Sequence, residues 1–131
     1  MGQKIHIVSH FKTDSGRLVS DSGAMAALGN EAGTFAPYEL LLGALSFCLF
    51  RTFESLAEKM KVGYEGMDMH INGEKRDEKV ATLQTCHIQV TAKGVEDQEK
   101  FTKAFETATR YCSIFNTLNH VATMTWDIAF A

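Results

Sequence analysis

The sequence predicts an α+β fold in which short strands occur in blocks around two helices, in the order βββ-α-ββ-α-β. One observation is a long apolar run over residues 36–61, which is too long for a strand. Another is the set of short alternating segments before and after it, each bounded by turn residues. Because the strands occur in blocks and do not alternate with helices, a doubly wound α/β sheet is disfavoured.

The central helix is expected over residues 36–61. Pro37, the only proline, suits a first helical turn, and Glu39 in the same turn suits the positive end of the helix dipole. Residues 40–50 are apolar on nearly every face, which is typical of a buried helix, and after Arg51 the pattern becomes amphipathic. The apolar run is short and soon interrupted by charges, so we expect it not to span a bilayer, which needs about 20 apolar residues.

The remaining elements follow from alternation, helical periodicity and turn signals. The expected strands are residues 4–12, 17–20, 24–28, 63–72, 81–92 and 121–130. A second helix should begin at Asp97 and end at Tyr111, with an apolar stripe along one side, and residues 112–118 form a short further helix. The charged run 73–79 indicates the solvated end of a hairpin.

Composition limits the classes of function. A chain of 131 residues with 45% hydrophobic and 22% charged residues fits one folded domain. A net charge of −3 argues against nucleic acid or an anionic membrane as the main partner. The first residues have no apolar run of signal-peptide length, so we expect a cytoplasmic protein.

The cysteines are the candidate chemical groups. Cys48, Cys86 and Cys112 are odd in number, so a disulfide framework is a poor explanation and thiol chemistry or simple burial is a better one. Cys86 follows the alternation of its strand and needs no function. No C-x-x-C pair exists and the histidines lack ligand spacing, so no metal or other cofactor is expected.

Two motifs resemble one known family. The segment P-Y-E-L-L-L-G-A-L-S-F-C-L at residues 37–49 and the segment R-Y-C-S-I-F-N-T-L at residues 110–118 are similar to motifs of the OsmC/Ohr family, named for osmotically inducible protein C and the organic hydroperoxide resistance protein. The resemblance covers nearly the whole chain. It implies one OsmC-like domain over residues 1–131 and an intertwined homodimer, with two central helices between sheets and two active sites at the interface.

The resemblance also implies a reaction. In that family the cysteine that matches Cys48 attacks a hydroperoxide and becomes a sulfenic acid, and the cysteine that matches Cys112 condenses with it to a disulfide. A dithiol reductant, such as a dihydrolipoyl group on a partner protein, then restores both thiols. Such chemistry needs a thiolate nucleophile and a second thiol that traps the sulfenic acid. Apolar surroundings would favour an organic hydroperoxide as the small-molecule substrate.

The chain departs from the family pattern around the first cysteine. In the peroxidases a glutamate lies ten residues before it, where this chain has Tyr38, and Glu39 is the nearest carboxylate. Glu39 is a candidate catalytic residue across the dimer, and a first-turn acid of the helix is at least as good an interpretation. The family's thiolate-holding arginine has two candidates here, Arg17 and Arg51.

A further departure is Ser113, which stands where many members have proline after the second cysteine. This pattern is similar to the less characterised OsmC-like branch. Two functions therefore stay open: a thiol-dependent peroxidase for organic hydroperoxides, or a dimeric binding or sensing protein that uses the apolar pocket of the interface with little turnover.

Overall fold

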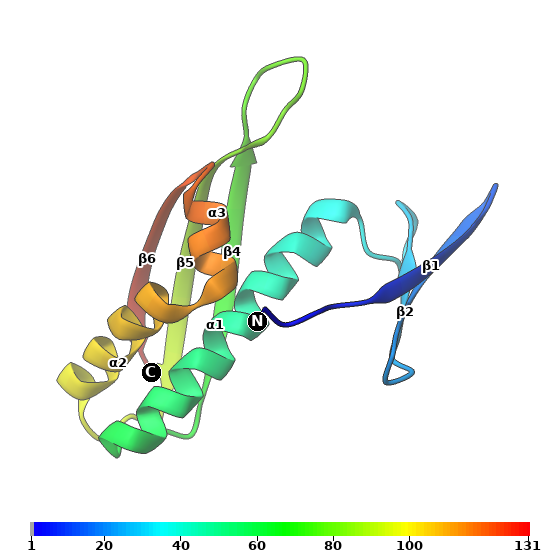
Figure 1. Cartoon of the computed structure of the whole chain (residues 1–131). Helices are drawn as coiled ribbons and strands as arrows, with labels where there is room; N and C mark the ends of the chain where they lie inside the picture. Colours follow the sequence, from blue (N-terminus) through cyan, green and yellow to red (C-terminus); the bar gives the residue numbers. More distant parts are fainter. Residues whose placement is uncertain (1) are drawn as a thin grey trace. The chain divides into compact units, whose positions relative to one another are not determined.

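A computed structural model describes residues 2–131 of the chain, which form six strands and three helices (Figure 1). The strands are β1 (Ile7–Lys12), β2 (Ser15–Ser20), β3 (Met25–Leu28), β4 (Gly66–Lys75), β5 (Leu83–Lys93) and β6 (Thr123–Phe130). The helices are α1 (Pro37–Met60), α2 (Gln98–Tyr111) and α3 (Ser113–Asn119). The predicted α+β class and order of elements are confirmed, including the short helix after the second cysteine.

The chain divides into two compact units, one up to Leu41 and one from Leu42 to Ala131. In the first unit β1, β2 and β3 form an antiparallel meander. Every residue of β1 is exposed, including Ile7 and Phe11, the latter at 70%. This small sheet therefore presents apolar side chains that it does not bury itself.

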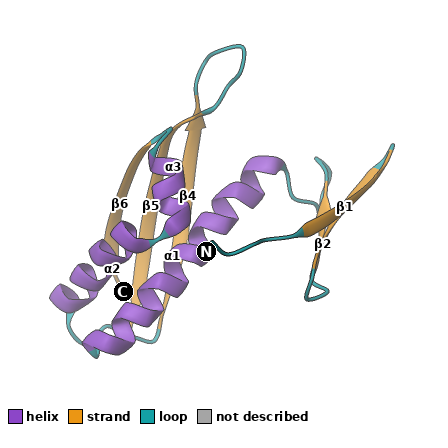
Figure 2. Ribbon diagram, in the orientation of Figure 1, coloured by secondary structure: helices purple, strands orange, loops and turns teal. Residues whose placement is uncertain are grey.

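In the second unit the sheet order is β4-β5-β6. Strands β4 and β5 pair antiparallel, whereas β5 and β6 pair in parallel with Ile88 opposite Trp126. Parallel neighbours need a crossover connection, which here consists of α2 and α3. Both helices and the second-unit part of α1 lie on one face of this sheet (Figure 2).

The core of the second unit lies between that sheet face and the helices. Alternate residues of β5 are fully buried, among them Ile88 and Val90. From α1, Phe53 places its ring 4.7 Å from the ring of Phe101 on α2. These aromatic contacts hold α1 against α2 and so fix the part of α1 that carries Cys48.

The helix α1 begins as predicted, but its burial differs from the prediction. Pro37 opens the helix, and the Glu39 carboxylate accepts a hydrogen bond from the backbone N–H of Ala36 at 2.8 Å, as in a capping box. Only four of its residues are buried: Leu45, Leu49, Phe53 and Ala57. The prediction of burial on every face is wrong for the described chain, because Phe47, in the middle of the apolar run, remains 63% exposed.

By length and composition alone, α1 is apolar enough to cross a membrane. The apolar run that we expected to be too short for this is part of a helix of 24 residues. Its place in the fold gives the better explanation of its composition: Leu45, Leu49 and Phe53 form one buried stripe of a core helix.

The predicted hairpin between β4 and β5 is longer than expected. Strand β4 continues to Lys75, and Glu74 still pairs with Thr85, so the first part of the charged run belongs to the ladder. Beyond it, the Arg76 guanidinium donates hydrogen bonds to the carbonyl of Leu83 and, at 2.8 Å, to the carbonyl of Val121. Arg76 thus fastens the base of the hairpin to the chain that enters β6.

Candidate functional site

Cys48 and Cys112 meet in the second unit, although they are far apart in the sequence. Cys48 lies in the middle of α1 and is half-buried. Cys112 is fully buried and is the single residue between α2 and α3. Both thiols are free, and they lie close enough for each to shift the pKa of the other. The structure therefore brings the two predicted site cysteines together.

The position of Cys112 is set by the junction of the two helices. Its backbone is extended, with φ −70° and ψ 116°, and its N–H closes α2 by bonding to the carbonyl of Ala108 at 2.8 Å. Its sulfur is at the same time the N-cap acceptor of α3, 3.4 Å from the backbone nitrogen of Phe115. With its acceptor role used by α3, the S–H of Cys112 is available to donate to Cys48.

Asn116 stabilises this junction from inside α3. Its side-chain Nδ2 donates to the carbonyl of Cys112 at 2.8 Å and to the carbonyl of Arg110 at 3.0 Å, with a longer contact of 3.4 Å to the carbonyl of Thr109. The carbonyls of Arg110 and Thr109 belong to the last turn of α2, where helix carbonyls lack an intrahelical partner, and the carbonyl of Cys112 also accepts the backbone N–H of Asn116 at 3.0 Å. One amide group therefore holds the bend that presents Cys112 to Cys48.

The sulfur of Cys48 receives several hydrogen bonds. The Oγ atom of Ser113 lies 3.7 Å from the Cys48 sulfur. The backbone N–H groups of Ser113 and Ile114 also point at it, together with the Cys112 thiol. All of these donors come from one short segment at the start of α3, and all are uncharged.

These contacts shift the pKa values of the two thiols in opposite directions. Burial acts to raise the pKa of Cys48, but the hydrogen bonds from Ile114, Cys112 and Ser113 together outweigh it and hold that pKa below its ordinary value. Burial raises the pKa of Cys112 to about 11, and the hydrogen bond to Cys48 with the negative charge on that sulfur adds to the rise. Cys48 thus has the character of a nucleophile and Cys112 that of a proton-carrying partner.

The other residues singled out by sequence lie elsewhere. Cys86 is fully buried in β5, and burial raises the pKa of its thiol, in keeping with a structural residue. Arg51 reaches Glu54, with 3.7 Å between Nε and Oε1, and lies 5.8 Å from the centre of the Phe47 ring. Arg17 belongs to β2, where it pairs with His10 and Ala27. The groups that lower the pKa of Cys48 are hydrogen-bond donors of residues 112–114.

The carboxylate of Glu39, the third predicted site residue, accepts the hydrogen bond from Ala36 described above. Its part in catalysis stays a prediction. Within residues 2–131, no group of three or more His, Cys, Asp or Glu side chains is arranged to hold a metal ion.

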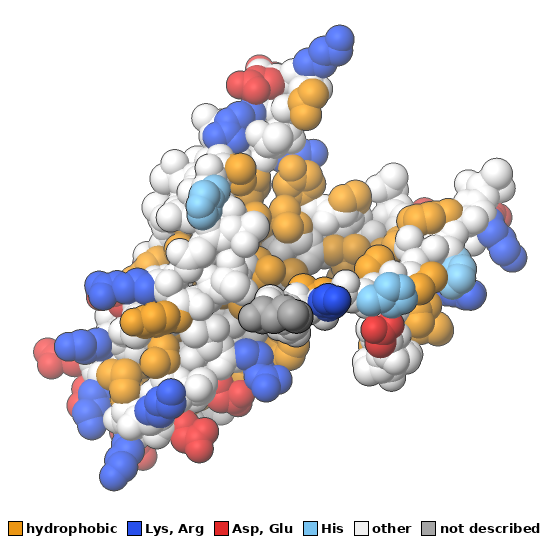
Figure 3. Space-filling model, viewed as in Figure 1, with side chains coloured by type: hydrophobic (Ala, Val, Ile, Leu, Met, Phe, Trp, Pro, Cys, Tyr) orange, Lys and Arg blue, Asp and Glu red, His pale blue; other side chains and the backbone are white. Residues whose placement is uncertain are grey.

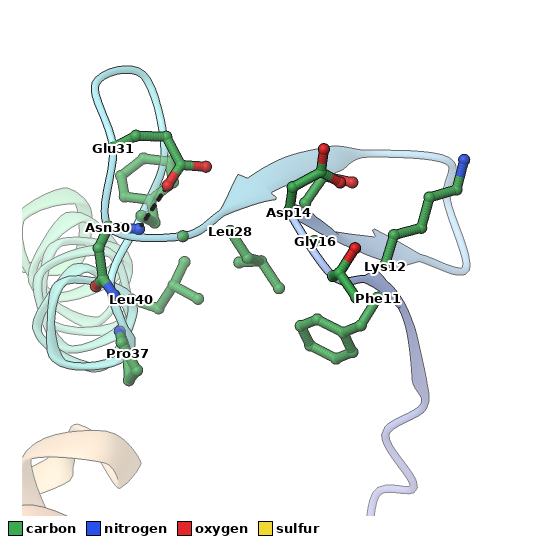
Figure 4. Close-up of a pocket in the computed structure, with 13 residues that line it drawn as sticks. Phe11, Lys12, Asp14, Gly16, Leu28, Asn30, Glu31, Pro37 and Leu40 are labelled. Atoms are coloured by element: carbon green, nitrogen blue, oxygen red, sulfur yellow. Dashed lines mark hydrogen bonds between the residues drawn. The ribbon is translucent and has the colours of Figure 1, made fainter.

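The first unit has a cavity of its own, of about 500 Å³ (Figure 4). Phe11, Leu28 and Leu40 direct apolar side chains toward it, and Lys12 and Glu31 supply charges at its lining. The Glu31 carboxylate accepts a hydrogen bond from the backbone N–H of Asn30 at 3.2 Å. The space is therefore mainly apolar with a few polar groups, as small-molecule pockets commonly are.

The comparison with protein families settles the family of the chain. A family model described as OsmC-like protein matches residues 29–127, a span that includes both Cys48 and Cys112. The chain belongs to the OsmC-like family. The predicted resemblance to the OsmC/Ohr family is confirmed, whereas no curated protein matches this OsmC-like chain.

Solved structures show the same fold at low sequence identity. The OsmC-like protein of Mycoplasma pneumoniae is 18% identical with a TM-score of 0.89, over 100% of this chain and 99% of that chain. An organic hydroperoxide resistance protein OsmC, also described as a predicted redox protein, from Legionella pneumophila is 14% identical with a TM-score of 0.75, over 97% of each chain. The organic hydroperoxide resistance protein OhrB of Bacillus subtilis is 14% identical with a TM-score of 0.72, over 97% of this chain and 98% of that chain.

Proposed function

We propose that this OsmC-like protein is a thiol-dependent peroxidase that reduces organic hydroperoxides, with Cys48 as the peroxidatic and Cys112 as the resolving cysteine. The observation that carries the proposal is the meeting of the two thiols in one site, where the Oγ atom of Ser113 lies 3.7 Å from the Cys48 sulfur and the pKa values of the thiols are shifted in opposite directions. A nucleophilic cysteine needs a lowered pKa, and a resolving cysteine needs to be within bonding reach of it. The similarity in fold to organic hydroperoxide resistance proteins supports the same function.

In the first step the Cys48 thiolate attacks the terminal oxygen of the hydroperoxide. The O–O bond breaks, an S–O bond forms, and the alcohol leaves after taking up a proton. The sulfur is oxidised by two electrons to a sulfenic acid, and the hydroperoxide is reduced by the same two electrons. The donors around the Cys48 sulfur hold its pKa below the ordinary value, which favours the starting thiolate.

In the second step Cys112 attacks the sulfenic sulfur, forming the disulfide and releasing water. Burial is the main cause of the raised pKa of Cys112, and the charge on Cys48 contributes as well. Once Cys48 is a neutral sulfenic acid, that second contribution vanishes, so the Cys112 thiol ionises more readily when it is needed. A dithiol reductant then returns two electrons by thiol–disulfide exchange.

The proposal includes a homodimer in the cytoplasm. Large apolar side chains stay exposed in both units of the single chain, and hydrophobic atoms are visible at the surface around the strands β1–β3 (Figure 3). The most exposed examples outside the hairpin are Ile5, Tyr111, Met25, Phe11 and Phe47. Exposed apolar area of this kind favours association with a second copy, which would cover it.

The alternative function is that of a binding or sensing protein with little turnover. The observation in its favour is the apolar cavity of about 500 Å³ in the first unit, whose lining includes neither Cys48 nor Cys112. In this case a ligand would occupy the cavity and the thiols would not be consumed.

Titration of the reduced protein with cumene hydroperoxide distinguishes the two functions. We expect one equivalent to consume both thiols and to give a Cys48–Cys112 disulfide, detected by mass spectrometry of the unreduced peptides. Unchanged thiols at stoichiometric oxidant would favour the binding function. A Cys48→Ser variant that removes the hydroperoxide as fast as the parent would end the peroxidase proposal. Cys86→Ser is the matched control, because that thiol is buried in β5 and should not affect turnover.

A further inference from the structure

Ser113 lies against the proposed reactive sulfur in a way that the sequence did not indicate. Its Oγ atom is 3.7 Å from the sulfur of Cys48, within hydrogen-bonding distance for sulfur. It directly follows Cys112, so one dipeptide brings both a thiol and a hydroxyl to the same sulfur atom. Cys112 has a place in the proposed reaction as the resolving thiol, and Ser113 has none so far.

The hydrogen bond of Ser113 changes character when Cys48 ionises. Between a thiol and a hydroxyl, either group can donate. A thiolate has no hydrogen, so the hydroxyl must then be the donor, and a hydrogen bond to an ionised acceptor is the stronger kind. A contact that strengthens on ionisation favours the ionised form.

Ser113 shares this role with two neighbours, the backbone N–H of Ile114 and the thiol of Cys112. Cys112 is the titratable group that faces the sulfur from the same segment, and it donates as a neutral thiol. On α1 itself the nearest cation in sequence is Arg51, whose guanidinium is engaged with Glu54. The stabilisation of a negative sulfur in this site therefore depends on uncharged donors.

We propose that Ser113 is a thiolate-stabilising residue of the peroxidase site, donating to the Cys48 sulfur through its hydroxyl and its backbone N–H. The inference rests on the proposed function for its catalytic meaning. It goes beyond that function because it assigns to a serine the task that a cation performs in many reactive cysteine sites.

Three substitutions at this position separate the two donors. Ser113→Ala removes the hydroxyl and keeps the N–H, Ser113→Thr keeps both, and Ser113→Pro removes both. Proline fits here, because residue 113 is the first of α3 and Cys112 before it has the extended backbone that a following proline requires. Ser46→Ala on α1 is the matched control, since its hydroxyl donates to the carbonyl of Gly43 and not to a thiol.

The measurement is the rate at which iodoacetamide alkylates Cys48 across pH, followed by mass spectrometry of the peptide that carries it. At pH 7 we expect Ser113→Ala to react about three- to tenfold more slowly than the parent, as the loss of one net hydrogen bond implies. Ser113→Pro should be slower still, whereas Ser113→Thr and Ser46→Ala should match the parent. At a pH high enough to ionise Cys48 fully, all of the variants should react equally fast.

A Ser113→Ala protein that folds normally by circular dichroism and keeps the parent's alkylation profile would overturn the inference. If the proline variant fails to fold, the alkylation rates of Ser113→Ala and Ser113→Thr still show whether the hydroxyl of Ser113 matters. Alkylation needs neither peroxide nor reductant, so its outcome is independent of the proposed function. If Ser113→Ala slows the alkylation of Cys48 but the parent does not react with hydroperoxide, only the peroxidase proposal fails. If Ser113→Ala leaves the alkylation rate unchanged and the parent is an active peroxidase, only the role of Ser113 fails.

Discussion

Cys112 lowers the pKa of Cys48, and its own sulfur accepts a hydrogen bond from the backbone N–H of Phe115. One cysteine therefore serves two partners: a helix that it starts and a second thiol that it stabilises as an anion. The hydrogen-bond donors of residues 112–114 thus make the two sulfurs chemically unequal.

The unequal thiols predict an order of labelling. At pH 7 iodoacetamide should modify Cys48 well before Cys112 or Cys86, because only the pKa of Cys48 is lowered while burial raises the pKa of the other two. Peptide mass spectrometry at increasing times gives the order directly. Cys112→Ala should slow the labelling of Cys48, because it removes one of the donors. Labelling of Cys112 first would contradict the assignment of roles.

The buried thiols predict a loss of stability in alkali. Burial raises the pKa of Cys112 from the ordinary 9.0 to about 11, and it raises the pKa of Cys86 as well. Below pH 9 both the folded and unfolded states keep these protons and the stability is fully present. Between about pH 9 and about pH 11 the unfolded state loses them first, so the free energy of unfolding falls. Urea denaturation at several pH values measures this fall, and Cys86→Ala should reduce it; an equal fall in parent and variant would contradict the prediction.

Removal of the Asn116 amide should loosen the junction of α2 and α3. Asn116→Ala removes the side-chain donor to the carbonyl of Arg110 and one of the two donors to the carbonyl of Cys112, so we expect a loss of about 1 kcal/mol in the free energy of unfolding. Disulfide formation after oxidation should also slow, because Cys112 is less well held. Asn119→Ala, an exposed change in the same helix, is the control and should stay within about 0.5 kcal/mol of the parent. Equal stability of the two variants would rule out the role of Asn116.

The exposed ring of Phe47 predicts the oligomeric state. We expect the parent to sediment as a dimer, and Phe47→Ser to weaken that dimer, because the ring is 63% exposed in the single chain. Val80→Ser is a matched control, since Val80 is 75% exposed but lies at the tip of the hairpin. Sedimentation equilibrium across a range of protein concentrations tests both. A parent that is monomeric at every concentration would refute the homodimer.

Local patterns were enough to predict most of the elements. Pro37 marked the start of α1, and the stripe through Phe101 and Phe105 marked α2. The end of β4 was predicted too early, because cross-strand pairing of Glu74 with Thr85 overrides the low strand preference of a charged run. The parallel pairing of β6 with β5 was not predicted, since alternation within one strand does not specify its neighbour.

The site was predicted less completely than the fold. Cys48 and Cys112 were paired through the family resemblance, because nothing in local periodicity brings two distant cysteines together. Arg51 was a reasonable candidate for a nearby cation, yet its side chain turns to Glu54. Ser113 was noted only as a departure from a family pattern, although its place next to Cys112 was a signal that it lies beside the same sulfur.

The two long connections of the second unit differ in how freely they can be re-engineered. Arg76 fastens the base of the hairpin, so an affinity tag or a fluorophore placed among the exposed residues 77–80 would leave the strands paired. The crossover through α2 and α3 offers no such freedom, because a single inserted residue beside Cys112 would turn α3 and carry both Cys112 and Ser113 away from Cys48. A reporter group for the thiol chemistry should therefore be attached to the hairpin. Substitutions meant to change the rate of that chemistry should be made at the crossover.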